Sequence, residues 1–101
     1  MKNNWENTGI KMQVIEELRA LAQLYGLEKV ILFGSRARGD FYRTSDIDLA
    51  VSGGDIVRFS LDAEEETSTL LQFDVVDLNS TLDEELRQSI DSEGRIIFEK
   101  V

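Results

Sequence analysis

The segment 29–33 (KVILF) begins with Lys29 and continues as an unbroken run of β-branched and apolar residues that ends directly at Gly34. Polar and apolar residues do not alternate in it, which is typical of a strand buried on both faces. A second strand is predicted over 46–51 (DIDLAV), where Ser52 and two glycines end it. These strands require a sheet with other elements packed on both of its sides.

Helical periodicity surrounds the two strands. Val14, Leu18, Leu21 and Tyr25 recur at spacings of four, three and four, which predicts an amphipathic helix terminated by Gly26. Further along, the pattern predicts a helix over about 55–72, a strand over 73–78, a short helix capped by Ser80 or Thr81 and closed by Gly94, and a strand over 95–99. The predicted fold class is α/β (α+β), with a single mixed sheet of about four to five strands flanked by helices.

The chain length of 101 residues corresponds to one domain. Residues 1–9 are polar apart from Trp5, so we predict a flexible leader over 1–9 and a single domain over 10–101. A domain of this size has room for one site and little room for a separate substrate-binding domain.

The composition excludes several kinds of chemistry, because cysteine and histidine are both absent. Disulfides, zinc–thiolate sites and cysteine nucleophiles are excluded, and the usual general base is missing. Catalysis in this chain has to use carboxylates, hydroxyls, Lys, Arg and backbone amides.

The net charge constrains the partners. Eleven Lys and Arg against twenty Asp and Glu give a formal charge of −9. Such a surface repels nucleic acid and anionic membranes on average, and no apolar stretch approaches the roughly 20 residues of a membrane span. The first residues also lack the apolar core of a signal peptide. We therefore expect no direct nucleic-acid binding, no membrane association and a cytoplasmic location.

The second strand begins with two carboxylates, Asp46 and Asp48, which point to the same face because they are two residues apart. Like charges this close raise each other's pKa unless a cation lies between them, and Mg²⁺ is typically bound by one or two carboxylates plus phosphate oxygens. An isolated Asp-x-Asp is more often a solvated strand face, so the neighbouring residues decide the interpretation.

Those neighbours favour phosphate binding. Gly34 and Ser35 follow the buried strand, where glycine lets backbone amides approach an anion and serine adds a hydroxyl donor. Arg36, Arg38 and Arg43 place three of the eleven cations in the insert that follows. A cationic loop beside two carboxylates, in a strongly acidic protein, is typical of a polyphosphate site.

The third strand supplies another carboxylate, Asp74, near its beginning. If this strand neighbours the second, Asp74 completes a triad and can accept a proton from an incoming hydroxyl nucleophile. Asp77 is the alternative, but it lies on the opposite face of the strand from Asp74.

Gly34-Ser35, ten residues, and then Asp46-x-Asp48 resemble the signature of the nucleotidyltransferase superfamily related to DNA polymerase β. Within it, GSRARGD, SDIDLAV and FDVVDL resemble the minimal nucleotidyltransferases (MNT) encoded beside HEPT-domain partners. The resemblance implies two Mg²⁺ ions on Asp46, Asp48 and Asp74, which form the catalytic and metal-binding set, and ATP as the substrate. The nucleotide-binding residues expected are Gly34, Ser35, Arg36, Arg38 and Ser45.

The resemblance also implies an acceptor on another protein, because larger relatives carry extra domains for their acceptors. MNT relatives act as antitoxins that attach AMP to a tyrosine of the HEPT toxin. Two alternatives stay open: a non-catalytic module that neutralises its partner by binding, and a small-molecule nucleotidyltransferase of the aminoglycoside type. The sequence leaves open a homo-oligomer or a hetero-oligomer.

Overall fold

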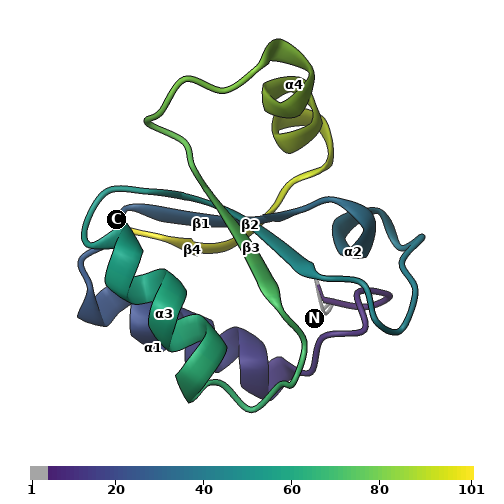
Figure 1. The fold of residues 1–101 in the computed structure, drawn as a ribbon, viewed down its shortest axis with the longest axis horizontal. Coiled ribbons are helices and arrows are strands. Elements are labelled where there is room, and N and C mark those ends of the chain that lie inside the picture. Colours follow the sequence, from purple (N-terminus) through teal and green to yellow (C-terminus); the bar gives the residue numbers. More distant parts are fainter. Residues whose placement is uncertain (1–4) are drawn as a thin grey trace.

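The computed structural model describes residues 5–101 as a four-stranded mixed sheet with helices on both faces (Figure 1). The strands are β1 (Lys29–Phe33), β2 (Ile47–Ser52), β3 (Phe73–Asp77) and β4 (Arg95–Glu99), and the helices are α1 (Met12–Leu24), α2 (Ser35–Arg38), α3 (Ile56–Glu66) and α4 (Glu84–Glu93). The sheet order is β3-β2-β1-β4, with β1 antiparallel to β2 and β4, and β2 parallel to β3. The predicted fold class is confirmed.

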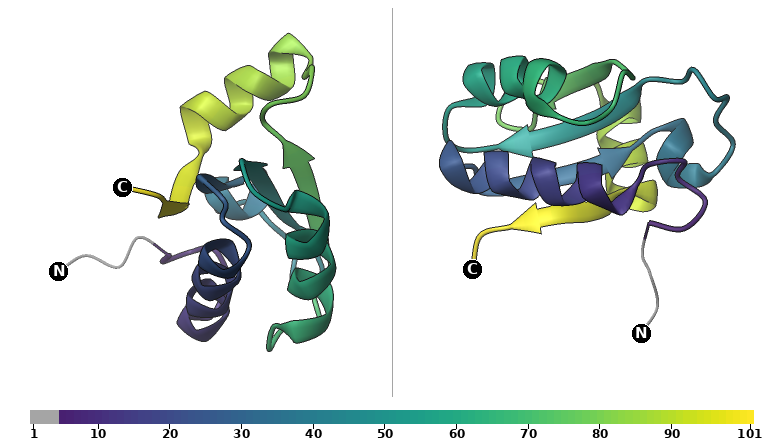
Figure 2. Two further views of the ribbon diagram at one scale, coloured as in Figure 1. Left: turned by 90° about the vertical axis from the view of Figure 1, so that its left-hand side faces the viewer. Right: turned by 90° about the horizontal axis from the view of Figure 1, so that it is seen from below.

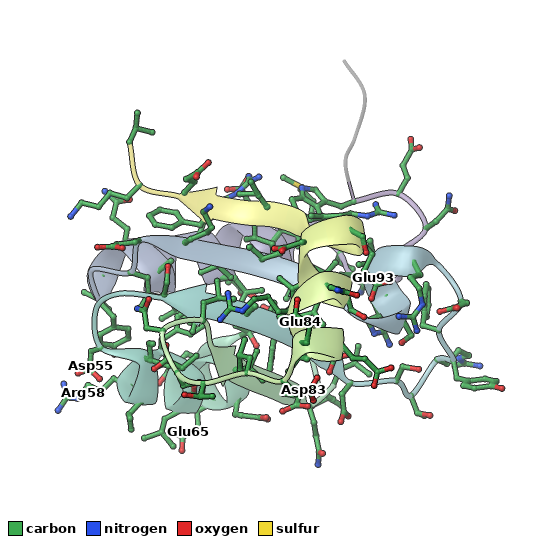
Figure 3. All side chains as sticks on the ribbon, turned by 90° about the horizontal axis from the view of Figure 1, so that it is seen from above. Asp55, Arg58, Glu65, Asp83, Glu84 and Glu93 are labelled. Atoms are coloured by element: carbon green, nitrogen blue, oxygen red, sulfur yellow. The ribbon has the colours of Figure 1, made fainter. Side chains whose placement is uncertain are left out.

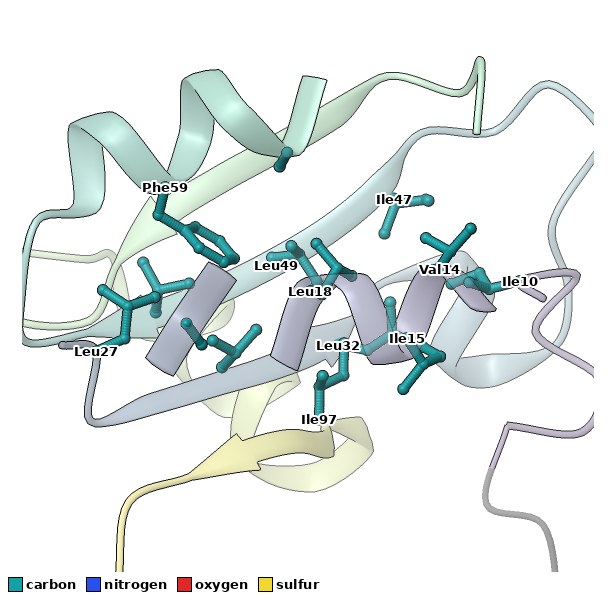
Figure 4. Close-up of a cluster of buried hydrophobic side chains, with 14 of the residues drawn as sticks. Ile10, Val14, Ile15, Leu18, Leu27, Leu32, Ile47, Leu49, Phe59 and Ile97 are labelled. Carbon is teal, nitrogen blue, oxygen red and sulfur yellow. The ribbon is translucent and has the colours of Figure 1, made fainter. Parts of the chain in front are cut away.

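Helices α1 and α3 cover one face of the sheet, and α4 lies over the other, as the two turned views show (Figure 2). The main core lies between the sheet and the α1–α3 layer, where Leu18, Leu49 and Phe59 are completely buried (Figure 4). A smaller cluster, Phe33, Ala50 and Ile90, packs under α4. Side chains of β1 and β2 therefore enter both cores, which explains why their sequences do not alternate.

Helix α3 ends at Glu66, several residues before the predicted end near 72. Ser68 leaves the helical path because its N–H and Oγ both donate to Glu17 of α1, at 2.8 and 2.6 Å. By Gln72 the chain has already joined the sheet, since the carbonyl of Gln72 accepts from Ile47 N–H at 2.9 Å. Leu70 fits the helical spacing of apolar residues, yet its side chain is fully exposed. The sequence pattern therefore extends beyond the observed end of α3.

The start of α4 also differs from the prediction. Asp83 is the N-cap, and its Oδ1 accepts from Leu86 N–H at 2.9 Å. Ser80 instead belongs to the turn after β3, where its Oγ donates to the carbonyl of Asp77 at 2.7 Å. The predicted caps Ser80 and Thr81 are therefore wrong, whereas Gly94 closes the helix as expected by donating to the carbonyl of Ile90 at 3.0 Å.

Residues 5–9, which the sequence predicts as part of a flexible leader, pack against the domain, and residues 1–4 lie outside the described part. Residues 5–10, called the N-terminal turn below, contain the buried side chains of Trp5, Thr8 and Ile10. Thr8 Oγ1 donates to the carbonyl of Trp5 at 2.7 Å and accepts from Ile10 N–H at 3.2 Å. The segment is thus an ordered part of the core.

The exterior is acidic, and Figure 3 shows Glu65 of α3 together with Asp83 and Glu84 at α4 among its surface side chains. Within residues 5–101, no helix has the length and apolar character needed to cross a membrane.

The cap of α4 makes a testable prediction. Replacing Asp83 with Ala removes a charged acceptor from a helix N-terminus and should lower the free energy of unfolding by about 1 kcal/mol. Replacing the exposed Thr81 with Ala should change it by less than about 0.5 kcal/mol. Urea unfolding followed by circular dichroism measures both, and equal losses in the two variants would contradict the assignment of the cap.

Candidate active site

The site lies at one end of the sheet, where β1 ends and β2 and β3 begin. The strand register pairs Phe33 of β1 with Asp48 of β2, and Asp48 with Asp74 of β3. Gly34 and α2 follow β1 directly at this end (Figure 1). The sequence predicts that Asp74 joins the other carboxylates if its strand neighbours the second strand. The pairing of β3 with β2 meets this condition.

Gly34 is in direct contact with the Asp48 carboxylate. Its φ of 78° and ψ of −158° lie in a region that is essentially restricted to glycine. A methyl group added at Gly34 would collide with Asp48 Oδ2. Conformation and space therefore both require glycine here, and together they hold a carboxylate against the turn that begins α2.

The turn of α2 presents backbone N–H groups. Gly34 is its N-cap and provides no side-chain cap. The carbonyls of Gly34 and Ser35 already accept bonds from Arg38 N–H at 3.1 Å and Gly39 N–H at 2.8 Å. The first N–H groups of a helical turn have no helical acceptor, which leaves them available to an anion. We call Gly34 and Ser35 the phosphate cradle.

Asp48 is the electrostatically perturbed group of the site. Burial is the largest cause that raises its pKa, the carboxylates of Asp74 and Asp46 add to it, and the guanidinium of Arg38 acts in the opposite direction, so that the pKa of Asp48 is raised to about 6. Asp46, just before β2, and Asp74 are both exposed. Two exposed carboxylates thus act on a third that is half-buried, and a cation would relieve their repulsion.

The donor set suits a hard divalent cation that shares its coordination with a phosphate. In the described part of the chain, no three acidic side chains stand close enough to enclose a metal ion by themselves. Mg²⁺ typically keeps several waters and takes one or two carboxylates plus substrate phosphate oxygens. Asp46 and Asp48 beside the cradle fit that mode of binding and do not fit a preformed protein cage.

The predicted phosphate contact of Arg36 does not agree with its position. Its side chain is only 1% exposed, and burial lowers the pKa of its guanidinium. Its donors are engaged by the carbonyls of Thr8, Ser45, Arg43 and Tyr42, at 2.8, 3.0, 3.1 and 3.5 Å. The charge also lies over the ring of Phe41, with 4.6 Å from Cζ to the ring centroid. Arg36 is therefore a structural residue.

Arg38 and Ser45 lie at the rim of the site. The guanidinium of Arg38 is partly exposed and pairs with Asp40 at 3.1 Å and with Glu93 of α4 at 2.9 Å. Ser45 Oγ accepts from Tyr42 N–H at 2.8 Å and so closes the insert just before Asp46. Its own hydroxyl hydrogen is able to donate elsewhere.

Two residues near the site were not anticipated from the sequence. Glu93 pairs with Arg38, and Arg95 donates from Nε and Nη2 to the carbonyl of Ala37 in α2 at 3.1 and 2.8 Å. Both belong to the last elements of the chain, far from the motif in sequence, and no local pattern points to them.

A cleft of about 790 Å³ lies at the opposite end of the sheet, where Lys29, Leu78 and Arg87 are among its lining residues. None of the three carboxylates lines it. The three carboxylates therefore lie apart from this cleft, at the open edge around Gly34.

Comparisons with known proteins agree with the geometry. The family described as polymerase beta, nucleotidyltransferase matches residues 16–101. A Methanocaldococcus jannaschii protein assigned as a protein adenylyltransferase is 33% identical over 82 residues, which span 71% of this chain and 79% of the relative.

Solved structures share the fold. A chain of a toxin–antitoxin complex with AMP-PNP matches with a TM-score of 0.69 and 26% identity, over 85% of this chain and 73% of that one. A chain of the complex between a tri-AMPylated Shewanella oneidensis HEPN toxin and its MNT antitoxin matches with a TM-score of 0.65 and 21% identity, over 90% of this chain and 74% of that one. Together with the residues at the sheet edge, the family match and the 33% identical relative establish that this chain belongs to the polymerase beta nucleotidyltransferase family.

Proposed function

We propose that this nucleotidyltransferase moves AMP from ATP onto a hydroxyl group of a partner protein, as the antitoxin of a toxin–antitoxin pair. The observation that carries the proposal is the Asp48 carboxylate held against Gly34, with Asp46 and Asp74 close enough to perturb its pKa. This arrangement places an anion-binding turn and a cation-binding pair side by side, which is the requirement for handling a nucleoside triphosphate.

The residues take the following roles in the proposal. Backbone amides of Gly34 and Ser35 hold the triphosphate, and Arg38 on the rim neutralises part of its charge. Asp46 and Asp48 hold Mg²⁺, with Asp74 as the third carboxylate. Two Mg²⁺ ions bound there would supply charge neutralisation at the attacking and leaving oxygens.

The chemical step is an in-line displacement at the α-phosphorus. The acceptor hydroxyl oxygen forms a bond to this phosphorus while the bond to the pyrophosphate oxygen breaks, and pyrophosphate leaves. Asp74 is exposed at the start of β3 and takes the hydroxyl proton, because the chain has no histidine for this role. Positioning and charge neutralisation carry most of the rate.

Two comparisons support a protein acceptor. The 33% identical relative is assigned as a protein adenylyltransferase, and a 26% identical chain was solved in a toxin–antitoxin complex with AMP-PNP. The toxin in one matching structure is of the HEPN type and carries AMP. We therefore propose a HEPN-type partner, which replaces the HEPT label expected from the sequence.

The direct test is transfer of AMP from α-labelled ATP in host-cell lysate with added Mg²⁺. A discrete labelled protein band is expected with the intact protein. The double variant Asp46→Asn, Asp48→Asn should lose at least about a hundredfold in labelling rate, since cation-assisted charge neutralisation contributes several kcal/mol.

Asp77→Asn is the matched control, because this carboxylate lies at the other end of β3 and accepts from Asn79 N–H at 2.8 Å. It should label at close to the wild-type rate. Labelled RNA or a labelled small molecule would overturn the protein acceptor. An unlabelled partner that is nevertheless bound in a pull-down would favour the non-catalytic module.

The raised pKa of Asp48 predicts a pH-dependent stability in the absence of metal. Below about pH 4 this carboxyl is protonated in both the folded and the unfolded chain. As the pH rises from about 4 through the folded pKa of about 6, the unfolded chain loses its proton first, so the folded state loses stability. Asp48→Asn removes this penalty and should raise the melting temperature at pH 8 but leave it unchanged near pH 4.

Thermal unfolding between pH 4 and pH 8, with EDTA or with Mg²⁺ and ATP, measures the effect. Mg²⁺ with ATP should stabilise the wild-type protein at pH 8 and have little effect on Asp48→Asn. The same gap in melting temperature at every pH would show that Asp48 does not titrate in this range.

A further inference from the structure

The N-terminal turn is joined to the active site by two arginines that reach it from different elements. Arg36 of α2 donates to the carbonyl of Thr8 at 2.8 Å, and Arg95 of β4 donates to the carbonyl of Glu6 at 3.1 Å. The turn precedes residue 16, where the family match begins. It therefore lies outside the matched region, against the edge of the sheet that carries the three carboxylates.

The same guanidinium groups also hold the two segments that carry the site. Besides Thr8, Arg36 Nε donates to the carbonyl of Ser45, the residue immediately before Asp46, at 3.0 Å. Besides Glu6, Arg95 donates through two nitrogens to the carbonyl of Ala37 in α2. Each arginine thus ties the N-terminal turn to the main chain beside a predicted ligand.

The packing around Arg36 opposes the loss of any single hydrogen bond of its guanidinium. A buried guanidinium is tolerated only when its donors are satisfied, and among the described residues no buried side-chain nitrogen or oxygen lacks a hydrogen-bond partner. Gly9 lies against the stack of Arg36 on Phe41, because a methyl group added there would lie 2.6 Å from both. The turn, Arg36 and the insert 36–45 form one packed unit.

We propose that Arg36 and Arg95 are positioning residues, which use the N-terminal turn as a brace that fixes the phosphate cradle relative to Asp46. The inference rests on the proposed function, since the cradle and Asp46 are the groups it aligns. Arg36 directly follows Ser35 in the sequence, and its Nε donates to the carbonyl of Ser45, the residue before Asp46. Its side chain therefore sets the separation between the phosphate cradle and Asp46. Misplacement of about 1 Å at a reacting centre costs up to about a hundredfold in rate.

The test compares Arg95→Lys with the matched control Arg87→Lys. Lysine keeps the charge, but its single ammonium group cannot span the carbonyls of Ala37 and Glu6 as the guanidinium does. Arg87 of α4 donates to the carbonyl of Leu78 at 3.3 Å, at the far end of the sheet. At saturating Mg²⁺ and ATP we expect about a tenfold loss of AMP transfer in Arg95→Lys and less than a twofold loss in Arg87→Lys.

Gly9→Ala disturbs the brace within the N-terminal turn, where the added methyl group would collide with Arg36 and Phe41, and it changes neither arginine. Because Gly9→Ala and Arg95→Lys act on one unit, their double variant should lose no more activity than the more impaired single variant, whereas independent losses multiply. The emission of Trp5, the only tryptophan, reports whether the turn is docked, and circular dichroism well below the melting temperature confirms that the rest is folded.

The outcomes separate this inference from the proposed function. Wild-type protein that neither binds Mg²⁺–ATP nor transfers AMP overturns both. Normal wild-type transfer, with Arg95→Lys as active as Arg87→Lys or with multiplying losses in the double variant, overturns the brace alone. A non-additive loss in which Trp5 emission shifts to longer wavelength while the circular dichroism is unchanged supports it.

Discussion

The pairing of β1 with β2 is the constraint on which the site depends. The register places Phe33 opposite Asp48, and the parallel pairing of β3 places Asp74 beside Asp48 on the other side. Each strand contributes one residue at the same edge, and the chain leaves β1 through Gly34 at that edge. A slip of one residue would turn Asp48 into the hydrophobic core and a leucine out of it. The apolar core therefore defines where the carboxylates stand.

Two partly or fully buried charges in this domain are handled in opposite ways. Arg36 is surrounded by carbonyl oxygens and an aromatic ring, so its burial is compensated within the chain. Asp48 faces two further carboxylates, and the guanidinium of Arg38 acts against them. The first charge is compensated within the protein, whereas the second stays under repulsion, which the proposed cation would relieve. Uncompensated charge of this kind is what a binding site retains at the expense of stability.

The sequence predicted the elements whose signals are local. The bounds of β1 and β4 agree with the prediction, because an apolar run between glycine or polar stops needs no distant partner to be recognised. The end of α3 depends on Glu17, 51 residues away from Ser68, and was missed. The motif Gly34-Ser35 with Asp46 and Asp48 was located from its residue types, its place after a buried strand and its resemblance to the nucleotidyltransferase signature. Which arginine of the insert is buried could not be read from it, because Arg36 and Arg38 differ only in the three-dimensional positions of their acceptors.

The two ends of the sheet also differ in what they leave accessible. Residue 101 follows β4 at the end remote from α2, while the N-terminal turn lies at the catalytic edge (Figure 1). A molecule anchored to a surface through its last residue therefore presents Gly34, Asp46 and Asp48 outward. Anchoring through the first residues would instead apply mechanical force to the N-terminal turn, which contacts both Arg36 and Arg95. The C-terminal end of the chain is thus the attachment point that leaves the edge with the carboxylates accessible.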